Sequence, residues 1–267
     1  MRKIAFIGVG NMAGAILGGI IRSGAMDYDH VVLSDCLPDK CAPYAECGAT
    51  VASSVAEAAR LADCVVLSVK PQNFADILPE LAAVEGIERK LIVTIAAGIT
   101  VDTVKTALGG APVVRVLPNT PMLIGQGVSV VCRADDVATD DFAFVCSLFE
   151  ASGRVLVIDE SEMNRIISVT SSSPAYVFAF INAILQGAHA QGLEIDGLLD
   201  CICDVVIGSA ALLKAGGLTP EEQIRVVTSK GGTTERAMGV LADRGMTDMV
   251  VDAMRACTAR ADELGGK

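Results

Sequence analysis

The feature that most restricts the fold of this chain is a β/α alternation that stops partway along it. From residue 3 to residue 159, short apolar runs alternate with segments of helical spacing, and after Asp159 the strand-like runs cease. The expected strands are KIAFIGV, HVVLSD, DCVVLSV, LIVTIAA, VVRVLP, VSVVC and RVLVID, and helices are expected at 11–23, 53–61, 73–83, 101–108 and 139–150. Apolar strands that alternate with helices predict a mostly parallel sheet with helices on both faces.

The rest of the chain shows helical spacing only, at 162–191, 195–215, 220–228, 234–244 and 247–264. Thr219, Pro220 and Glu222 form a helix start signal, in which the threonine is the N-cap and the proline takes the first helical position. The segment 195–215 is apolar on nearly every side, which in a small helical domain predicts packing against another subunit. We therefore expect an α/β domain at residues 1–160 and an all-helical dimerisation domain at 161–267.

Composition narrows the classes of partner and compartment. The formal net charge of −11 argues against nucleic acid and anionic membranes as partners. No 18-residue stretch is continuously apolar, and glycines soon interrupt the apolar start of the chain, so we expect a cytoplasmic protein. The nine cysteines form no CxxC pair and neither histidine lies near a cysteine cluster, so we expect reduced, mostly buried thiols and no metal site.

A glycine-rich turn follows the first expected strand directly. The run Gly8-Val9-Gly10-Asn11-Met12-Ala13 matches the G-x-G-x-x-G/A pattern of dinucleotide binding, and strand, turn and helix occur in the required order. Gly8 permits the tight turn, and Gly10 allows a pyrophosphate to approach the backbone at the helix N-terminus. This predicts a Rossmann-type doubly wound sheet whose pyrophosphate site includes Gly8, Gly10, Asn11 and Met12.

Three later segments follow strands at the sheet edge where open α/β sheets bind their ligands. They are Ser68–Gln72, Ala96–Gly98 and Val116–Pro121. Each one alone is an ordinary turn, but their common position predicts further cofactor-binding residues. These are Val69, Lys70, Pro71, Ala97, Gly98 and Asn119.

The segment SKGGTT, residues 229–234, precedes a helical stretch and contains no strong base and no thiol. Together with FIGVGNMAGAILGG, SVKPQ, TIAAGIT, VRVLPNTPMLIGQG and TSSSPAYVFAFINA, it resembles the pyrroline-5-carboxylate reductases over essentially the whole chain. The resemblance implies a Rossmann-type domain, a helical domain through which subunits dimerise, and a site between one nucleotide domain and the helical dimer. It also implies that 1-pyrroline-5-carboxylate is reduced to L-proline, in proline biosynthesis, by NADPH or NADH.

The resemblance also assigns the substrate residues. Ser229, Gly231, Gly232, Thr233 and Thr234 would bind the substrate, and Thr234, Ser229 and Thr233 are the expected catalytic residues. The Ser229 hydroxyl and the two threonine amides would hold the carboxylate, because glycines and a helix N-terminus suit an anion. The Thr234 hydroxyl would bond the ring nitrogen, and the family's site also includes the region of Ser172. The alternative for the threonines is helix capping alone.

The chain departs from the family pattern at two positions. Lys230 replaces the usual proline, which makes the turn less preorganised, and Ser171 replaces a usual glycine. Two other functions stay open. A β-hydroxyacid dehydrogenase-like enzyme would need a lysine in the segment 162–191, which contains none, and only Lys230 favours a non-catalytic dinucleotide-binding regulator.

The second expected strand ends at Ser34-Asp35, where a dinucleotide fold meets the adenosine ribose. A carboxylate accepts hydrogen bonds from a free 2′-hydroxyl and repels the 2′-phosphate of NADPH. No arginine follows in CLPDK, and Lys40 is expected to lie too far along to compensate. We therefore predict that NADH is used at least as well as NADPH. The other interpretation is that Asp35 faces solvent or caps the helix at Pro38.

Overall fold

The computed structural model describes residues 2–265. Residue 1 of the first predicted domain and residues 266–267 of the second lie outside the described residues. The described chain divides into two compact units. The sheet unit comprises residues 2–174 and 256–265, and the helical unit comprises residues 175–255. The end of the last helix and residues 161–174 therefore belong to the unit that contains the sheet.

The sheet unit is built on eight strands in the order β3-β2-β1-β4-β5-β6-β7-β8. The strands are β1 (Ile4–Ile7), β2 (Val31–Ser34), β3 (Thr50–Val51), β4 (Cys64–Leu67), β5 (Leu91–Thr94), β6 (Val113–Leu117), β7 (Gly127–Arg133) and β8 (Gly153–Val157). Only β6 and β7 pair antiparallel in this described sheet, which confirms the mostly parallel prediction. The two-residue β3 was not predicted, because it is exposed and too short to show a pattern.

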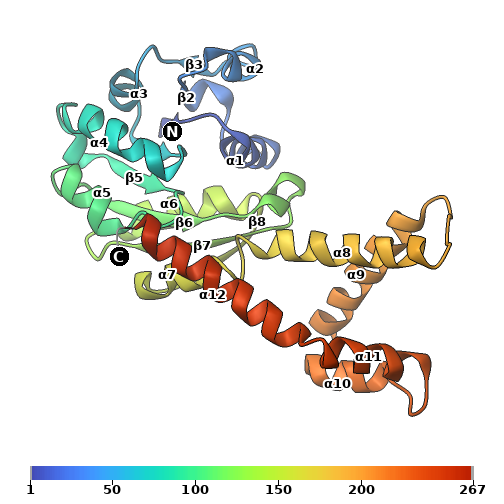
Figure 1. Ribbon diagram of the computed structural model, residues 1–267. Coiled ribbons are helices and arrows are strands. Elements are labelled where there is room, and N and C mark those ends of the chain that lie inside the picture. Colours follow the sequence, from blue (N-terminus) through green and yellow to red (C-terminus); the bar gives the residue numbers. More distant parts are fainter. Residues whose placement is uncertain (1, 266–267) are drawn as a thin grey trace. The chain divides into compact units, whose positions relative to one another are not determined.

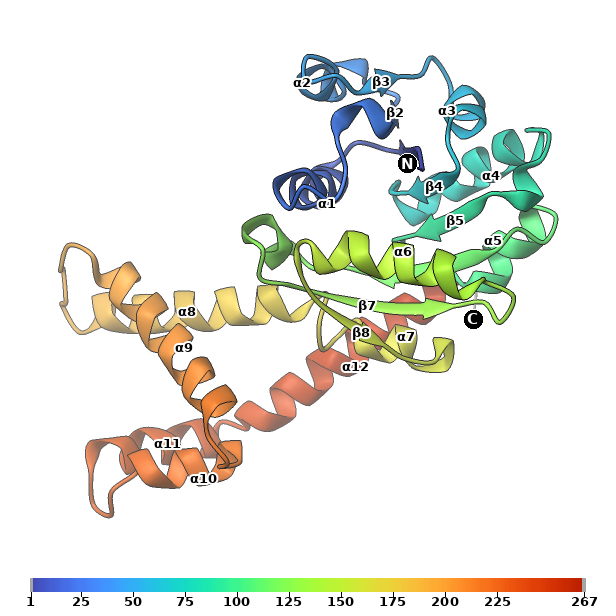
Figure 2. The same ribbon diagram turned by 180° about the vertical axis from the view of Figure 1, so that it is seen from behind.

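Helices cover both faces of the sheet (Figures 1 and 2). They are α1 (Asn11–Arg22), α2 (Ala42–Ala45), α3 (Val55–Leu61), α4 (Phe74–Ala82), α5 (Val101–Ala107), α6 (Thr139–Glu150) and α7 (Glu160–Ile166). On one side α1 packs against α6, and on the other α4 packs against both α3 and α5. Strands β1, β2, β4, β5 and β6 are buried over their whole length, which explains why their sequences are mostly apolar.

A polar network around the buried Arg115 ties helices to the far part of the sheet. The side chain of Arg115 in β6 is 1% exposed, and its guanidinium lies 3.4 Å from Glu160 Oε1 and donates to Asn164 Oδ1 at 2.6 Å. Glu160 also accepts from Val101 N, and Asn164 donates to Asp262 Oδ1 at 2.7 Å. Burial lowers the pKa of Arg115, which Glu160 partly offsets. The network therefore holds α5, α7 and the last turns of α12 to one strand.

The helical unit contains most of α8 (Ser173–Ala190), then α9 (Leu198–Ala215), α10 (Pro220–Val227), α11 (Thr233–Asp243) and the first part of α12 (Met246–Leu264). The expected capping box at Thr219 and Glu222 is present. The single helix expected at 162–191 was wrong, because α7 ends at Ile166 and α8 begins at Ser173. Pro174 cannot donate an amide hydrogen bond and disfavours a helical residue before it, so the helix restarts there.

Side chains of the helical unit are mostly exposed in the single chain. Of residues 175–255, all of which are described, Ile202 is the only buried one. On the same helix α9, Val205 is 66% exposed and Ile207 is 65% exposed. Among the described residues, no helix is both long enough and apolar enough to cross a membrane. The apolar character expected of 195–215 is therefore present as an uncovered surface.

Candidate functional site

The glycine-rich turn lies where the sheet changes winding direction, since β1 has β2 on one side and β4 on the other. Gly8 has φ +92°, and its amide donates to Ser34 O at 2.7 Å. A Cβ at Gly8 would lie 2.8 Å from Val69 Cγ1 and 3.0 Å from Ser68 O. At Gly10, the N-cap of α1, a Cβ would meet nothing within 4 Å. Gly8 is thus required by the fold, whereas Gly10 leaves open space at a helix N-terminus, as an approaching pyrophosphate needs.

A pocket of about 510 Å³ opens at the carboxyl ends of β1, β2 and β4. It brings together six predicted residues, namely Gly8, Gly10, Ser34, Asp35, Val69 and Lys70. Sequence reasoning missed other lining residues, including Cys36, Lys40, Ser53, Ser54, Asn73, Ile77 and Glu80. Ser54 was detectable as a helix N-cap, because serine is favoured at that position and Glu57 follows three residues later.

Six predicted cofactor residues do not line this pocket. Asn11 and Met12 form the first turn of α1, while Pro71, Ala97, Gly98 and Asn119 lie after strands β4, β5 and β6. Gly98 has φ +81°, and a Cβ there would lie 2.7 Å from Leu264 Cβ. The absence of a side chain at Gly98 therefore allows the end of α12 to pack closely against it. In the side chain of Asn119, Nδ2 donates to Thr170 O at 3.0 Å and Oδ1 accepts from Val128 N at 2.9 Å. Its side chain is therefore a structural link between loops.

Asp35 faces the glycine-rich turn rather than solvent. Its side chain is 6% exposed, and Oδ2 accepts from Val9 N at 2.7 Å while Oδ1 accepts from Leu37 N at 2.9 Å. Lys40 Nζ lies 3.5 Å from Oδ1, so the expectation that Lys40 lies too far along was wrong. The 3-10 turn at Pro38–Lys40 folds the chain back on itself. Burial acts to raise the pKa of Asp35, but the Val9 and Leu37 amides and Lys40 outweigh it and lower the pKa.

The segment SKGGTT forms a β-turn that leads into α11. Gly232 N donates to Ser229 O at 3.0 Å, and Gly231, the third residue of this turn, has φ +75°. Lys230, the second residue, has no positive φ, since all described residues with positive φ are glycines. That combination is a type II turn, which needs a residue such as glycine in third place. Gly232 is the N-cap of α11.

The first amides of α11 are available to a ligand. Gly232 has no side chain with which to cap the helix, and the amides of Thr233 and Thr234 have no hydrogen-bond partner among the described residues. The hydroxyl capping that we considered as an alternative for these threonines is not present at this N-cap. Free amides and adjacent hydroxyls at a helix start form a site suited to a small carboxylate.

Ser172 lies in the sheet unit, between α7 and α8. Its Oγ is 3.2 Å from Cys257 Sγ, and the neighbouring Ser171 has a buried Oγ without a partner in the described structure. Ser171 stands where the resemblance expects glycine. Ser172 is therefore packed against the second half of α12, and its role toward a substrate is taken up as a proposal below.

The thiols fall into three environments. Cys41, Cys64 and Cys132 are buried, Cys146, Cys203 and Cys257 are partly buried, and Cys36, Cys47 and Cys201 are exposed. Burial raises the pKa of Cys64 and Cys132 to about 12, so these two thiols stay protonated. The expectation of mostly buried thiols therefore holds for only part of the set.

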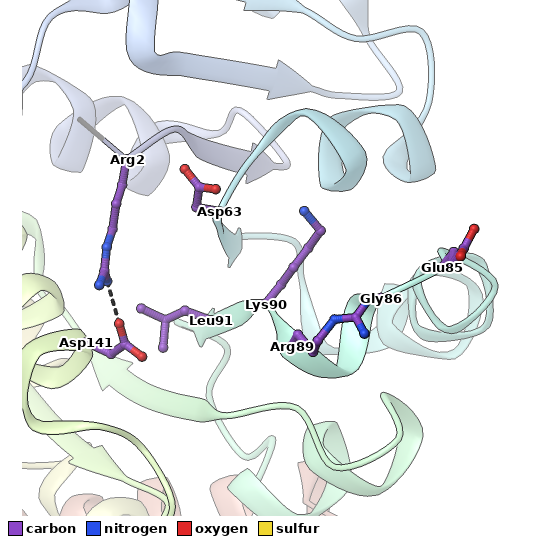
Figure 3. Close-up of a pocket in the computed structure, with 8 residues that line it drawn as sticks. All are labelled: Arg2, Asp63, Glu85, Gly86, Arg89, Lys90, Leu91 and Asp141. Carbon is purple, nitrogen blue, oxygen red and sulfur yellow. Dashed lines mark ion pairs between the residues drawn. The ribbon is translucent and has the colours of Figure 1, made fainter.

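Two other hollows lie away from these segments. One of about 760 Å³ opens at the amino ends of β1, β4 and β5, the opposite edge of the sheet. There Arg2 points at Asp141, 2.6 Å away, as Figure 3 shows, and Lys90 donates to Ala62 O. The other, about 910 Å³, borders the Arg115 network. Neither hollow contains a residue predicted to bind the cofactor or the substrate, which favours the glycine-rich crevice as the ligand site.

Two family models match the chain. Residues 3–98 match the family described as "NADP oxidoreductase coenzyme F420-dependent", and residues 160–264 match "Pyrroline-5-carboxylate reductase dimerisation". The first match covers the glycine-rich turn and the pocket around it. The second covers the helical unit with SKGGTT and agrees with the uncovered apolar helix α9.

Relatives extend the similarity over the whole chain. The pyrroline-5-carboxylate reductase of Escherichia coli is 36% identical over 265 residues, which cover 98% of each chain. That of Pisum sativum is 32% identical and covers 98% of this chain and 95% of its own. Among solved structures, the pyrroline-5-carboxylate reductase of Coxiella burnetii is 29% identical over 98% of both chains, with a TM-score of 0.86. A Plasmodium falciparum homologue with NADP bound, 23% identical over 99% of this chain and 98% of its own, has the same fold, with a TM-score of 0.91.

Proposed function

This chain belongs to the pyrroline-5-carboxylate reductase family, and we propose that it reduces 1-pyrroline-5-carboxylate to L-proline with a reduced nicotinamide dinucleotide. The observation that carries the proposal is the full-length similarity to enzymes of that name, which spans both units. The chain is accordingly an oxidoreductase of proline biosynthesis. The two other functions considered above have no such support.

The residues of the crevice fit a dinucleotide. Gly10 leaves space at the start of α1, so the pyrophosphate would lie against Gly8, Gly10, Asn11 and Met12. Ser34 and Asp35 would take the adenosine ribose, and Val69 and Lys70 would line the other side of the pocket, with Pro71 next to them in the chain. Ala97, Gly98 and the backbone of Asn119 would continue the path along the carboxyl ends of the strands. When bound, the cofactor supplies the hydride.

In the substrate turn, the hydroxyl of Ser229 and the amides of Thr233 and Thr234 would hold the ring carboxylate. Gly231 and Gly232 permit close approach, because they present no side chain to the substrate. The hydroxyl of Thr234 would accept a hydrogen bond from the N–H of the substrate iminium. This bond would orient the carbon–nitrogen bond of the substrate. Because the nitrogen arrives protonated, positioning suffices and no strong acid is needed. Ser172 would line the same site through its hydroxyl.

For the cofactor, we place the 2′-hydroxyl of NADH beside Asp35 and infer that NADH serves at least as well as NADPH. What supports this is a nearly buried carboxylate in the pocket whose lowered pKa keeps it ionised. An anion there disfavours a 2′-phosphate. Lys40, 3.5 Å away, reduces the repulsion, so the expected preference is modest.

Self-association follows from the match of the helical unit to a dimerisation family. We propose that a second copy covers the apolar residues of α9, as a homodimer or a multiple of dimers, without nucleic acid or membrane as a partner. The reaction is placed in the cytoplasm, where nine free cysteines stay reduced.

The decisive experiment measures oxidation of NADH and of NADPH by absorbance, with 1-pyrroline-5-carboxylate as the substrate. Substrate-dependent oxidation and formation of proline are expected. Gly10→Val is the control, because a Cβ at Gly10 would enter the pyrophosphate space and would meet nothing within 4 Å, and the variant should lose cofactor binding. Reduction of NAD+ or NADP+ by a β-hydroxyacid, with no oxidation of NADH or NADPH by the imine, would reject the proposal. Cofactor binding without any turnover would point to the regulator.

A further inference from the structure

The turn at residues 229–232 has an unusual residue in its second position. In a type II turn that position favours proline, because the ring fixes φ near the required value. Here it is occupied by Lys230, which is exposed and has no hydrogen-bond partner among the described residues. A lysine leaves the free chain with more conformations than proline does, so another contact must hold the turn.

Such a contact comes from α11. Glu235 is the third residue of this helix, and its Oε2 accepts from Gly231 N at 2.7 Å. The carboxylate thus binds the central peptide of the turn from the helix side, in the manner of a capping box. A negative charge in the first turn of a helix is also favourable for the helix itself. The amides of Thr233 and Thr234 remain free, because the bond from Glu235 goes to Gly231.

We propose that Glu235 is a positioning residue for substrate binding, which fixes the turn that Lys230 leaves free. The inference rests on the proposed function, since it takes 229–234 as the substrate turn. If the turn is formed only part of the time, the apparent Kd for its ligand is the intrinsic Kd divided by the fraction of molecules in which the turn is formed. Glu235 therefore acts on substrate affinity through Gly231, without touching the substrate.

The test is a set of steady-state measurements on Glu235→Ala, Glu235→Gln, Lys230→Pro and the Lys230→Pro/Glu235→Ala double variant. Glu235→Ala should raise KM for 1-pyrroline-5-carboxylate about 3- to 10-fold, the scale of one lost capping contact. KM for the cofactor should not change. Glu235→Gln keeps an acceptor oxygen and should stay within about twofold of wild type. In the double variant proline fixes the turn, and KM should return to within about twofold of wild type.

A matched control separates positioning from helix stability. Glu222 is also the third residue of a helix, α10, and its carboxylate accepts from Thr219 N at 2.7 Å. Glu222→Ala removes the same kind of contact from a different helix, so it should lower stability comparably and leave KM unchanged. An equal rise in KM for Glu222→Ala would show that the effect is general destabilisation.

The outcomes distinguish this inference from the function beneath it. If Thr234→Ala impairs turnover but Glu235→Ala leaves KM unaltered, or if proline does not rescue, the positioning role is wrong and the site stands. If both Ala and Gln variants lower KM, the carboxylate repels the substrate and the inference is overturned. If neither Thr234→Ala nor Ser229→Ala affects turnover, the substrate turn itself is wrongly assigned.

Discussion

In the sheet unit, five adjacent strands are buried from end to end, whereas across residues 175–255 only Ile202 is buried. Both units contain many apolar residues, but only the first covers them with its own chain. Burial of apolar surface is the main term that offsets the entropy lost on folding. The helical unit therefore obtains much of its stability from association, and the dinucleotide crevice obtains its stability from the unit that contains it.

The largest effect on this contrast between the units is expected from a charged side chain on the exposed apolar surface of α9. Val205→Glu places a carboxylate on α9 at a residue that is 66% exposed in the single chain, so we expect loss of the dimer and of activity. Binding of NADH to the sheet unit, followed by its fluorescence, should persist. Leu61→Glu, on an exposed position of α3, is the control and should stay dimeric. A fully active monomer in light scattering would contradict the expectation.

Within the sheet unit, the Arg115 network should carry far more stability than a surface pair. Glu160→Ala removes the carboxylate partner of a 1% exposed guanidinium, and we expect a loss of about 3 kcal/mol in the free energy of unfolding. Glu162→Ala breaks the exposed pair with Arg165 on the same helix and should cost under about 1 kcal/mol. Urea unfolding of both variants measures the difference. Equal losses would mean that the buried pair is no more than a surface contact.

The contrast between the units also shows what a sequence can reveal. Most of the parallel strands were predictable because each is a mostly apolar run, and the glycine-rich turn was predictable because strand, turn and helix follow in order. The break between α7 and α8 was detectable, because the polar run at residues 170–173 and Pro174 interrupt the apolar spacing there. The contacts of Asp35 with Val9 and of Asn119 with Thr170 join residues far apart in the chain, so no local pattern could show them.

In the helical unit, the substrate turn should govern chemistry without affecting the cofactor. Thr234→Ala should lower turnover about 10- to 1000-fold, the scale of one lost charge-stabilising or positioning hydrogen bond. Thr233→Ala is the matched control, because only its amide is assigned to the substrate and alanine retains it. Cofactor affinity, measured by titration, should stay constant in both. Equal turnover in the two variants would reject the distinct role of the Thr234 hydroxyl.

A smaller effect is expected on the free energy of unfolding when the pH is lowered, because Asp35 accepts a hydrogen bond from the glycine-rich turn. The pKa of Asp35 is lowered in the folded chain, so its ionised form adds stability that is complete above the unfolded pKa, about 3.9. This stability is lost as the pH falls through the pKa of Asp35 in the folded chain. Asp35→Asn should therefore be less stable than wild type at pH 7, and the gap should narrow below about pH 4. Urea midpoints of both proteins between these pH values test the sign, and a gap independent of pH would reject it.

The smallest expected effect concerns the choice between NADH and NADPH. Asp35→Ser removes the anion but also frees Lys40 from its partner 3.5 Å away, so both changes favour a 2′-phosphate. We expect kcat/KM for NADPH relative to NADH to rise about 10-fold, equivalent to about 1.4 kcal/mol. Lys40→Ala should shift the ratio the other way, toward NADH. The ratio should move while turnover with saturating cofactor stays nearly constant, because the substrate turn is untouched. A strong wild-type preference for NADPH that neither variant alters would show that the ribose does not meet Asp35.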